Sequence, residues 1–319
     1  MTEQTLNIGL GTAAIGRPQY INLRQEAIVD FSLDAFKKQG KLVLDEAYRK
    51  GIRYFDTAPG YGLAEQLLID WIEEKRHKDV EIATKWGYTY VANFNPNAII
   101  HEVKEHSLEK LNQQWEQSKS LLPYLTSYQI HSATFDSGIF KNIEALDRLS
   151  KLKSEYGLLI GLTTSGPNQS EVIKESLEIE RDGTALFDVF QVTYNLLDQS
   201  LTQIGKELIA QKKRIVIKEA LANGRIFPNR KYLNYNTLYQ ELQRLAIKYK
   251  VGIDAIALRF CIDSMEPFMV LSGASNEKHI VENLKATQFK LEEKDLFSLQ
   301  QLSISPEQYW QERKQLGWN

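Results

Sequence analysis

Four side chains that can hold or move protons stand at the ends of apolar, strand-like runs in this sequence. Asp56 follows one such run, and Tyr61 lies just beyond it in a turn. Lys85 and His131 each follow a later run. A short apolar run that ends in a polar residue before a turn is typical of a buried strand that opens into a loop. An acid, a phenol, an amine and an imidazole placed in this way predict one shared site.

This combination suits the protonation of a carbonyl oxygen. A free phenol titrates at about 10 and is a weak acid at neutral pH. A nearby ammonium favours the phenolate, and a carboxylate beside that ammonium keeps it charged, so Asp56 and Lys85 would tune Tyr61 as a general acid. His131 could donate a hydrogen bond to a substrate oxygen. Because no side chain supplies hydride, a reduction at this site requires a cofactor.

The composition limits the classes of partner. The chain has 319 residues, 43% of them hydrophobic, and 39 Lys and Arg are balanced by 41 Asp and Glu. This balance indicates no nucleic-acid partner. No apolar run approaches the roughly 20 residues that span a bilayer, and the N-terminus does not resemble a signal peptide, so we expect no membrane contact. The single cysteine, Cys261, suits a reducing compartment, and we expect a cytoplasmic protein.

Strand-like and helix-like segments alternate along the whole chain. The candidate strands are 6–10, 52–55, 80–84, 125–130, 157–163, 186–192, 214–218 and 267–271. The clearest amphipathic helix has its apolar face over 64–72, and another helix, near 34–50, ends at Gly51. Eight such units without a linker predict a single domain over 1–319, an α/β fold of the (β/α)8 (TIM) barrel type. Residues 291–319 predict a helix and a tail over the active-site face.

Such a barrel would bring the four side chains together. The active site of a (β/α)8 barrel lies at the carboxyl ends of its strands. Asp56, Lys85 and His131 are predicted at the ends of the second, third and fourth strands, and Tyr61 follows the second.

Several motifs resemble those of the aldo-keto reductase superfamily. They lie at 9–12 on the first strand, at 51–62 around the second, at 84–86, at 128–132, at 271–275 and at 282–283. The resemblance covers essentially the whole chain in the right order. It implies a (β/α)8 barrel, NADP(H) and interconversion of a carbonyl and an alcohol. It also implies that Tyr61 is the proton donor, Asp56 and Lys85 its tuning pair, and His131 a substrate-orienting donor.

The resemblance implies a set of cofactor-binding residues as well. They are Thr12, Ala13, Thr163, Thr164, Gln191, Lys218, Ala220, Leu221, Gly224, Gly273, Ser275, His279, Glu282 and Asn283. Gln191 matches a glutamine that holds the nicotinamide carboxamide. Ala220, Leu221 and Gly224 match positions that approach the pyrophosphate.

This set departs from the family pattern in three places. The pair Thr-Thr at 163–164 replaces a common Ser-Asn and loses an amide. Lys218 stands where many members place an aromatic ring beneath the nicotinamide. Gly273 and His279 replace the lysine and arginine of members strict for NADP. A helix predicted to begin at Ser275 would still favour a phosphate, so we expect NADP, with NAD as the alternative.

Other functions fit parts of the sequence. A regulatory subunit with this fold, like the potassium-channel β-subunits, would bind NADP with little turnover. A Schiff-base aldolase could use Lys85 or Lys218. The loose Rossmann pattern at 9–14 follows a very short strand, and neither Tyr-x-x-x-Lys nor a P-loop occurs. The expected partner is a small carbonyl or alcohol substrate. The number of subunits is not predicted from the sequence.

The remaining candidate residues predict no further site. His77, His101 and His106 lie in polar surroundings, and we expect them to be solvated. No pair of histidines has the spacing of zinc ligands, so no metal is expected. Trp86 either walls the pocket, as the resemblance implies, or packs in the core. Tyr309, Trp310 and Trp318 in the tail could line the pocket or serve in packing.

Overall fold

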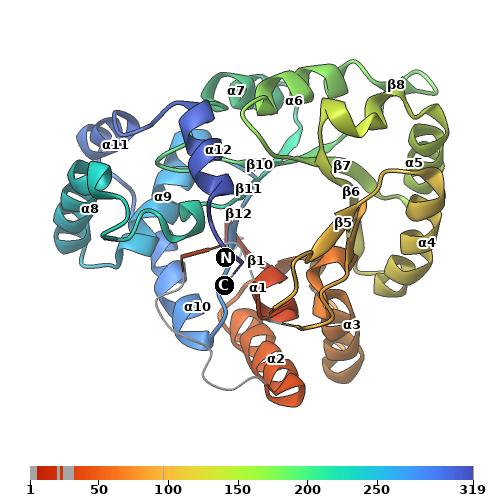
Figure 1. Ribbon diagram of the computed structural model, residues 1–319, viewed down its shortest axis with the longest axis horizontal. Helices are drawn as coiled ribbons and strands as arrows, with labels where there is room; N and C mark the ends of the chain where they lie inside the picture. Colours follow the sequence, from red (N-terminus) through yellow and green to blue (C-terminus); the bar gives the residue numbers. More distant parts are fainter. Residues whose placement is uncertain (1–5, 20–21, 24–31, 96, 319) are drawn as a thin grey trace.

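A computed structural model describes residues 6–19, 22–23, 32–95 and 97–318 of the protein. Eight parallel strands close into a barrel in the order β1-β12-β11-β10-β7-β6-β3-β2, and helices surround it (Figure 1). The barrel strands are β1 (Ile8–Gly11), β2 (Tyr54–Asp56), β3 (Glu81–Trp86), β6 (Leu125–Ala133), β7 (Leu159–Thr164), β10 (Val189–Thr193), β11 (Arg214–Lys218) and β12 (Met269–Ser272). The predicted (β/α)8 barrel and all eight predicted strands are confirmed.

The helices lie around the barrel, and most of them pack their apolar faces against its outside. They are α1 (Ala13–Gly16), α2 (Leu33–Arg49), α3 (Ala64–Lys75), α4 (Leu108–Ser118), α5 (Ile143–Tyr156), α6 (Gln169–Leu177), α7 (Thr202–Ala210), α8 (Asn236–Tyr249), α9 (Ile253–Met265), α10 (Glu277–Leu284), α11 (Glu293–Gln300) and α12 (Pro306–Lys314). On α3 the predicted apolar face is buried, with Trp71 fully enclosed. Gly51, which follows α2, has a φ of 97°. None of the helices in the described ranges is long and apolar enough to cross a bilayer.

Inside the barrel, the two-residue alternation of the strands separates an apolar layer from a polar one. The apolar layer contains Tyr54, Ala83, Val189, Val216, Met269 and Leu271, which form a core of their own. At the amino ends of the strands, Arg214 Nη1 pairs with Glu81 Oε1 at 2.7 Å. Two residues further along their strands than Tyr54 and Ala83, Asp56 and Lys85 face the same interior near the carboxyl ends.

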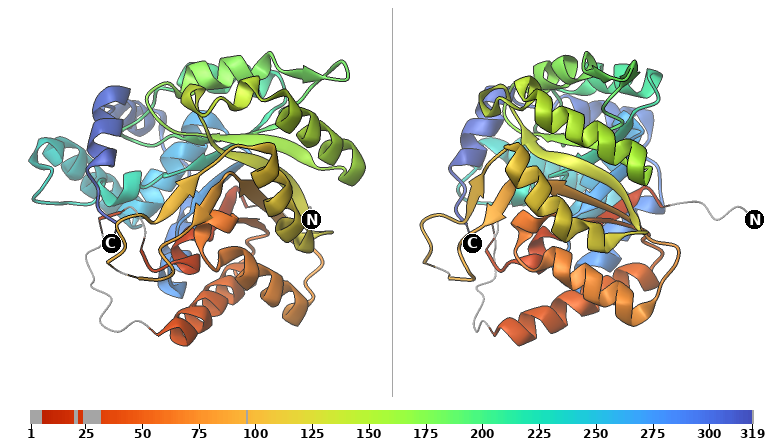
Figure 2. Two further views of the ribbon diagram at one scale, coloured as in Figure 1. Left: turned by 45° about the vertical axis from the view of Figure 1, so that its right-hand side comes forward. Right: turned by 90° about the vertical axis from the view of Figure 1, so that its right-hand side faces the viewer.

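Two additional hairpins are inserted between barrel elements. The first pairs β4 (Tyr88–Tyr90) with β5 (Glu102–Lys104), and the second pairs β8 (Glu180–Arg181) with β9 (Thr184–Ala185). The β4–β5 hairpin stands out from the barrel on the same side as the C-terminal tail (Figure 2). The two meet where the rings of His101 and Trp318 stack with centroids 4.4 Å apart.

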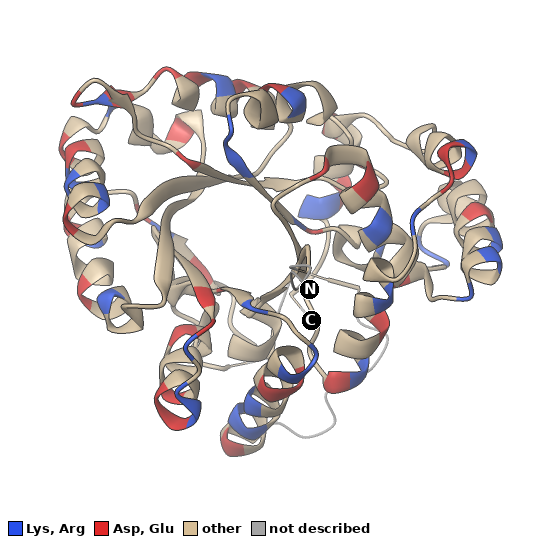
Figure 3. Cartoon of the chain, turned by 180° about the vertical axis from the view of Figure 1, so that it is seen from behind, with Lys and Arg blue, Asp and Glu red and all other residues tan. Residues whose placement is uncertain are grey.

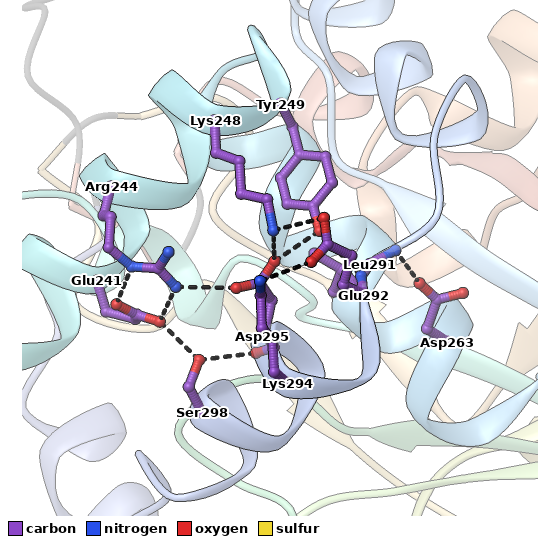
Figure 4. Close-up of polar contacts among 10 residues, drawn as sticks. All are labelled: Glu241, Arg244, Lys248, Tyr249, Asp263, Leu291, Glu292, Lys294, Asp295 and Ser298. Atoms are coloured by element: carbon purple, nitrogen blue, oxygen red, sulfur yellow. Dashed lines mark hydrogen bonds and ion pairs between the residues drawn. The ribbon is translucent and has the colours of Figure 1, made fainter.

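The C-terminal segment contains two helices where the sequence predicted one. α11 is fixed by a polar cluster in which the buried carboxylate of Asp295 accepts hydrogen bonds from Arg244, Lys248 and Tyr249 of α8 (Figure 4). The chain then continues as α12. Its Trp310 Nε1 donates to Asp198 beyond β10 at 3.2 Å. The predicted position of the tail, over the active-site face, is therefore confirmed.

Charged residues of both signs are spread over the outer helices (Figure 3). This distribution agrees with the formal net charge of −2.

One carboxyl group is buried between the barrel and its helices. Glu65 of α3 is fully enclosed, and its Oε1 accepts hydrogen bonds from Thr84 Oγ1 at 2.7 Å and Ser118 Oγ at 2.8 Å. Burial raises the pKa of Glu65 to about 7, although the two hydroxyls lower it in part. Since the pKa is higher in the folded chain than its ordinary value of 4.5, the folded state prefers a protonated Glu65.

Glu65 should therefore make the stability depend on pH. Its contribution is fully present below the unfolded pKa and is lost as the pH rises through the folded pKa, by up to about 3 kcal/mol. We expect Glu65→Gln to flatten the urea midpoint between about pH 5 and pH 8 relative to the parent. The exposed Glu73→Gln on the same helix is the control and should behave like the parent. Equal pH dependence in the parent and Glu65→Gln would contradict this account.

Candidate active site

A buried ion pair lies at the carboxyl end of the barrel. Lys85 Nζ donates to Asp56 Oδ1 at 2.6 Å and to the carbonyl oxygen of Thr57 at 3.0 Å, and the Lys85 side chain is fully enclosed. Gln191 Nε2 donates to the second oxygen, Oδ2, of Asp56 at 2.7 Å. Burial raises the pKa of Asp56, while Lys85 and Gln191 act to lower it. Each carboxylate oxygen thus has a donor, as a buried charge requires.

Tyr61 lies directly above this pair. It ends a short 3-10 helix (Pro59–Tyr61) that follows β2. Lys85 Nζ is 4.8 Å from the centroid of the Tyr61 ring, and the Tyr61 hydroxyl is 3.4 Å from His131 Nε2. Gly62 follows with a φ of 67°, and a Cβ atom there would lie 2.6 Å from the carbonyl oxygen of Gly16. Only glycine therefore fits where the chain turns away from the site.

The acidity of Tyr61 differs from the prediction. Burial raises the pKa of the phenol well above its ordinary value, and Asp56 acts in the same direction, while Arg17 opposes them. The lowered pKa expected from the nearby ammonium is therefore not found, because burial raises it more strongly. With its pKa raised, Tyr61 is protonated at neutral pH. The cations beside it would stabilise the phenolate that forms when the proton leaves.

His131 is presented by a bulge in β6. The pairing of β6 with β7 shifts register between Ile130 and Ala133, and Ser132 has a φ of 55°. Two hydrogen bonds hold this bulge: Ser132 N donates to Thr163 Oγ1 at 2.7 Å, and His106 Nε2 donates to the His131 carbonyl oxygen at 3.0 Å. The bulge aims the imidazole at Tyr61, as bulges near active sites commonly do.

The imidazole of His131 is neutral. Burial lowers its pKa well below the ordinary value, and the positive charges of Lys85, Arg17 and Lys218 lower it further. Its ring lies edge-on to that of Tyr61 and is 4.7 Å from that of Tyr88, centroid to centroid. A neutral imidazole has a single N–H, so it can donate one hydrogen bond without releasing a charge into the site.

The predicted exposure of His101 and His106 is wrong, and the two alternatives for Trp86 are resolved. His101 and His106 are buried, not solvated, because the His101 ring stacks on Trp318 of the tail and the His106 ring packs against Trp86 and Gly87. Burial lowers the pKa of His106 to about 4, so it too is neutral. Trp86 is fully enclosed and lies against His106, with ring centroids 5.4 Å apart. It is a core residue, because the strand alternation turns it away from the interior that Lys85 faces.

Three of the proposed cofactor residues have polar side chains near the carboxyl ends of the barrel strands, which we call the mouth of the barrel. Besides Gln191 and Thr163, Lys218 is at the end of β11, where its Nζ donates to Thr193 Oγ1 at 2.7 Å. Burial lowers the pKa of Lys218 to about 8, while Glu219 acts to raise it. The Thr164 hydroxyl instead donates to Gln169 Oε1 on α6, outside the barrel. Thr12 Oγ1 donates to the Asp56 carbonyl oxygen at 2.9 Å, and Ala13 begins α1 beside it.

The loop after β11 is held by the C-terminal helix. It contains Ala220, Leu221 and Gly224, and the backbone φ is positive at Glu219 and Gly224. The Glu219 carboxylate accepts hydrogen bonds from both Nε and Nη2 of Arg313 on α12. Burial alone would raise the pKa of Glu219, but Arg313 and Lys218 lower it to about 2. The loop is therefore joined to α12 through the ion pair of Glu219 and Arg313.

The remaining proposed cofactor residues cluster at the start of α10. Gly273 is exposed, and Ser275 Oγ lies 3.4 Å from His279 Nδ1. Asn276, and not Ser275, caps the helix, because its side chain accepts a hydrogen bond from His279 N. Asn283 Nδ2 donates to Ser272 Oγ at 2.7 Å, and Glu282 pairs with Lys285 one turn along.

The chemistry of this set fits an anionic dinucleotide. Gln191 offers an amide, Lys218 a partly buried ammonium and Thr163 a hydroxyl, while the start of α10 offers backbone N–H groups. Within the described residues, no three His, Cys, Asp or Glu side chains come together as metal ligands.

The sequence analysis missed Arg17 and His106 as parts of the site. Arg17 is buried, with its guanidinium 5.5 Å from the Tyr61 ring centroid. Arginine is usually exposed, so its type gave no signal. His106 is flanked by charged and polar residues in sequence. Its burial depends on Gly87, where a Cβ would lie 2.3 Å from the imidazole, and this contact is visible only in three dimensions.

Comparisons of the sequence with known proteins indicate its family. The sequence model of the aldo/keto reductase family matches residues 7–304. The NADH-specific methylglyoxal reductase of Escherichia coli is 23% identical over 95% of this chain and 96% of its own. An uncharacterized oxidoreductase of Bacillus subtilis is 26% identical over 84% of this chain and 89% of its own.

Solved structures share the fold. An aldo-keto reductase from Bacillus halodurans in its holo form aligns with a TM-score of 0.71 and 23% identity, over 94% of this chain and 92% of its own. The glycerol dehydrogenase of Gluconobacter oxydans aligns with a TM-score of 0.72 and 20% identity, over 93% and 90%. With the family match extending over nearly its whole length, the chain belongs to the aldo/keto reductase family of oxidoreductases.

Proposed function

We propose that this protein is an NAD(P)H-dependent oxidoreductase that interconverts a carbonyl compound (an aldehyde, ketone or sugar) and its alcohol. The observation that carries the proposal is the placement of Tyr61. Its hydroxyl is 3.4 Å from His131 Nε2, and its ring is 4.8 Å from the ammonium of Lys85, which Asp56 holds at 2.6 Å. Relatives named as a methylglyoxal reductase and a glycerol dehydrogenase support both directions of the reaction.

Each residue of the site has a separate role in this proposal. The nicotinamide, when bound, supplies the hydride to the carbonyl carbon. Tyr61 gives its proton to the carbonyl oxygen in reduction and takes it back in oxidation. His131 donates a hydrogen bond that fixes the same oxygen. Lys85 stabilises the phenolate left on Tyr61, and Asp56 keeps Lys85 charged and in place.

We further propose that Gln191, Lys218, the loop 219–224 and the start of α10 hold the cofactor. Lys218 replaces a flat ring with a flexible chain that ends in an ammonium bonded to Thr193. Ser275 and His279 lie close together at the start of α10, where we propose that a 2′-phosphate is recognised. NADP is therefore our first assignment, and NAD is the alternative. The relative named as NADH-specific keeps that alternative in the test.

Replacing Tyr61 tests the proposed acid. Tyr61→Phe removes the proton donor and keeps the ring, so we expect kcat for carbonyl reduction to fall by about 10²- to 10⁴-fold. Nicotinamide fluorescence should show that the cofactor still binds. The matched control is Tyr54→Phe, which removes a hydroxyl from the apolar layer of the barrel and should retain activity. Turnover by Tyr61→Phe at the parent rate would overturn the assignment.

A panel of aldehydes, ketones and sugars separates an enzyme from a regulatory subunit. Tight cofactor binding without turnover on any of them would favour the regulatory function.

Cofactor preference can be measured by titration with NADPH and NADH. We expect NADPH to bind more tightly than NADH. The double variant Ser275→Ala/His279→Ala should weaken the binding of NADPH by about tenfold, as expected for lost contacts to a phosphate. NADH is the matched control ligand, because it lacks the 2′-phosphate and its affinity should be unchanged. An equal loss of affinity for both cofactors, or no preference in the parent, would show that these residues do not select NADP.

A further inference from the structure

Arg17 fastens the turn that carries Tyr61. It follows α1, and its Nη1 donates to the carbonyl oxygen of Gly60 at 3.0 Å, immediately before Tyr61. Next to it, the Gly16 carbonyl oxygen accepts a hydrogen bond from Leu63 N at 2.8 Å. The chain before and after Tyr61 is therefore tied to the end of α1 by two hydrogen bonds.

The end of α1 and the Tyr61 turn are in close van der Waals contact. A Cβ atom at Gly16 would lie 2.2 Å from the Tyr61 carbonyl oxygen. Arg17 itself is only 3% exposed. Its Nη1 also pairs with Glu102 Oε2 of β5 at 2.8 Å, and its guanidinium lies 4.7 Å from the centroid of the Trp318 ring. The guanidinium is thus enclosed by the Tyr61 turn, the β4–β5 hairpin and the tail.

Tyr61 consequently has two cations near its ring, one on the barrel strand β3 and one directly after α1. The Lys85 ammonium is 4.8 Å and the Arg17 guanidinium 5.5 Å from the centroid of its ring. The charged or titratable groups around Tyr61 are Asp56, Lys85, His131, Arg17, Glu102 and Glu219. Among them, Arg17 and Glu102 form one ion pair whose two members act on Tyr61 with opposite sign.

We propose that Arg17 is a positioning residue for the reaction: it holds the Tyr61 turn through the Gly60 carbonyl oxygen and supplies a second positive charge beside the phenol. This inference rests on the proposed function of Tyr61. Burial and Asp56 have the larger effects on the pKa of Tyr61, and the pair adjusts it from outside the barrel, because Arg17 favours the phenolate and Glu102 disfavours it. Replacing Lys85 would break its buried ion pair with Asp56. Glu102 is partly exposed, so it can be replaced without disturbing that buried pair.

Opposite substitutions in the pair test the inference. The measurement is the pH profile of kcat/KM for oxidation of the best alcohol found in the substrate panel, which rises with pH as Tyr61 loses its proton. We expect Arg17→Met to displace the rising limb to higher pH and Glu102→Gln to displace it to lower pH, each by up to about one unit. At a fixed pH on that limb, this corresponds to a loss and a gain of up to about tenfold.

The double variant and a conservative one separate charge from structure. Arg17→Met/Glu102→Gln should return toward the parent profile, because it removes both members of the pair. Arg17→Lys keeps the charge, so its limb should stay within a few tenths of a pH unit of the parent, while kcat falls because the contact to Gly60 weakens. Thermal melting curves show which variants are folded, and Glu102→Gln tests the sign even if Arg17→Met does not fold.

Two results would overturn the inference. One is an Arg17→Met profile that superimposes on the parent. The other is a loss of activity in Glu102→Gln together with a double variant no better than Arg17→Met, which would mean a structural role only. Failure of the proposed function itself looks different, since the parent would then be inactive or Tyr61→Phe would remain active.

Discussion

The site depends on the ion pair between Lys85 and Asp56 inside the barrel. Two charges taken out of water are tolerated only when each has close partners, and removing one partner of such a pair typically costs about 3–5 kcal/mol. Here the partners come from several strands: Asp56 from β2, Lys85 from β3 and Gln191 from β10. Asp56 and Lys85 lie on neighbouring strands, whereas Gln191 reaches Asp56 from a strand that is not adjacent, so closure of the barrel supplies the donor to the second carboxylate oxygen.

The parts above the pair are positioned by close approaches of backbone. Gly62 lies against the carbonyl oxygen of Gly16, and the bulge at Ser132 turns His131 toward Tyr61. The arrangement keeps a high-pKa phenol next to cations and a neutral imidazole. Burial and the carboxylate of Asp56 thus keep the proton on Tyr61, while the guanidinium of Arg17 acts in the opposite direction and favours its loss.

The C-terminal segment completes the mouth from the other side. α11 is fixed to α8 through Asp295, and α12 holds Glu219 through Arg313, next to Lys218. Trp318 then reaches the β4–β5 hairpin and lies against both His101 and Arg17. One continuous set of contacts therefore links the loop after β11, where we propose that the cofactor binds, to the cation beside Tyr61.

The sequence by itself determined the eight strands, the barrel and the grouping of Asp56, Tyr61, Lys85 and His131, because these depend on local periodicity and on residues that end strands. It could not show that Arg17 and His106 are buried, that Trp86 faces the core or that Tyr61 has a raised pKa. Burial is a property of what other segments place around a side chain, and here those segments are a hairpin, a bulge and a tail distant in sequence. Tertiary structure alone decided these points, because desolvation and charge act through space and not along the chain.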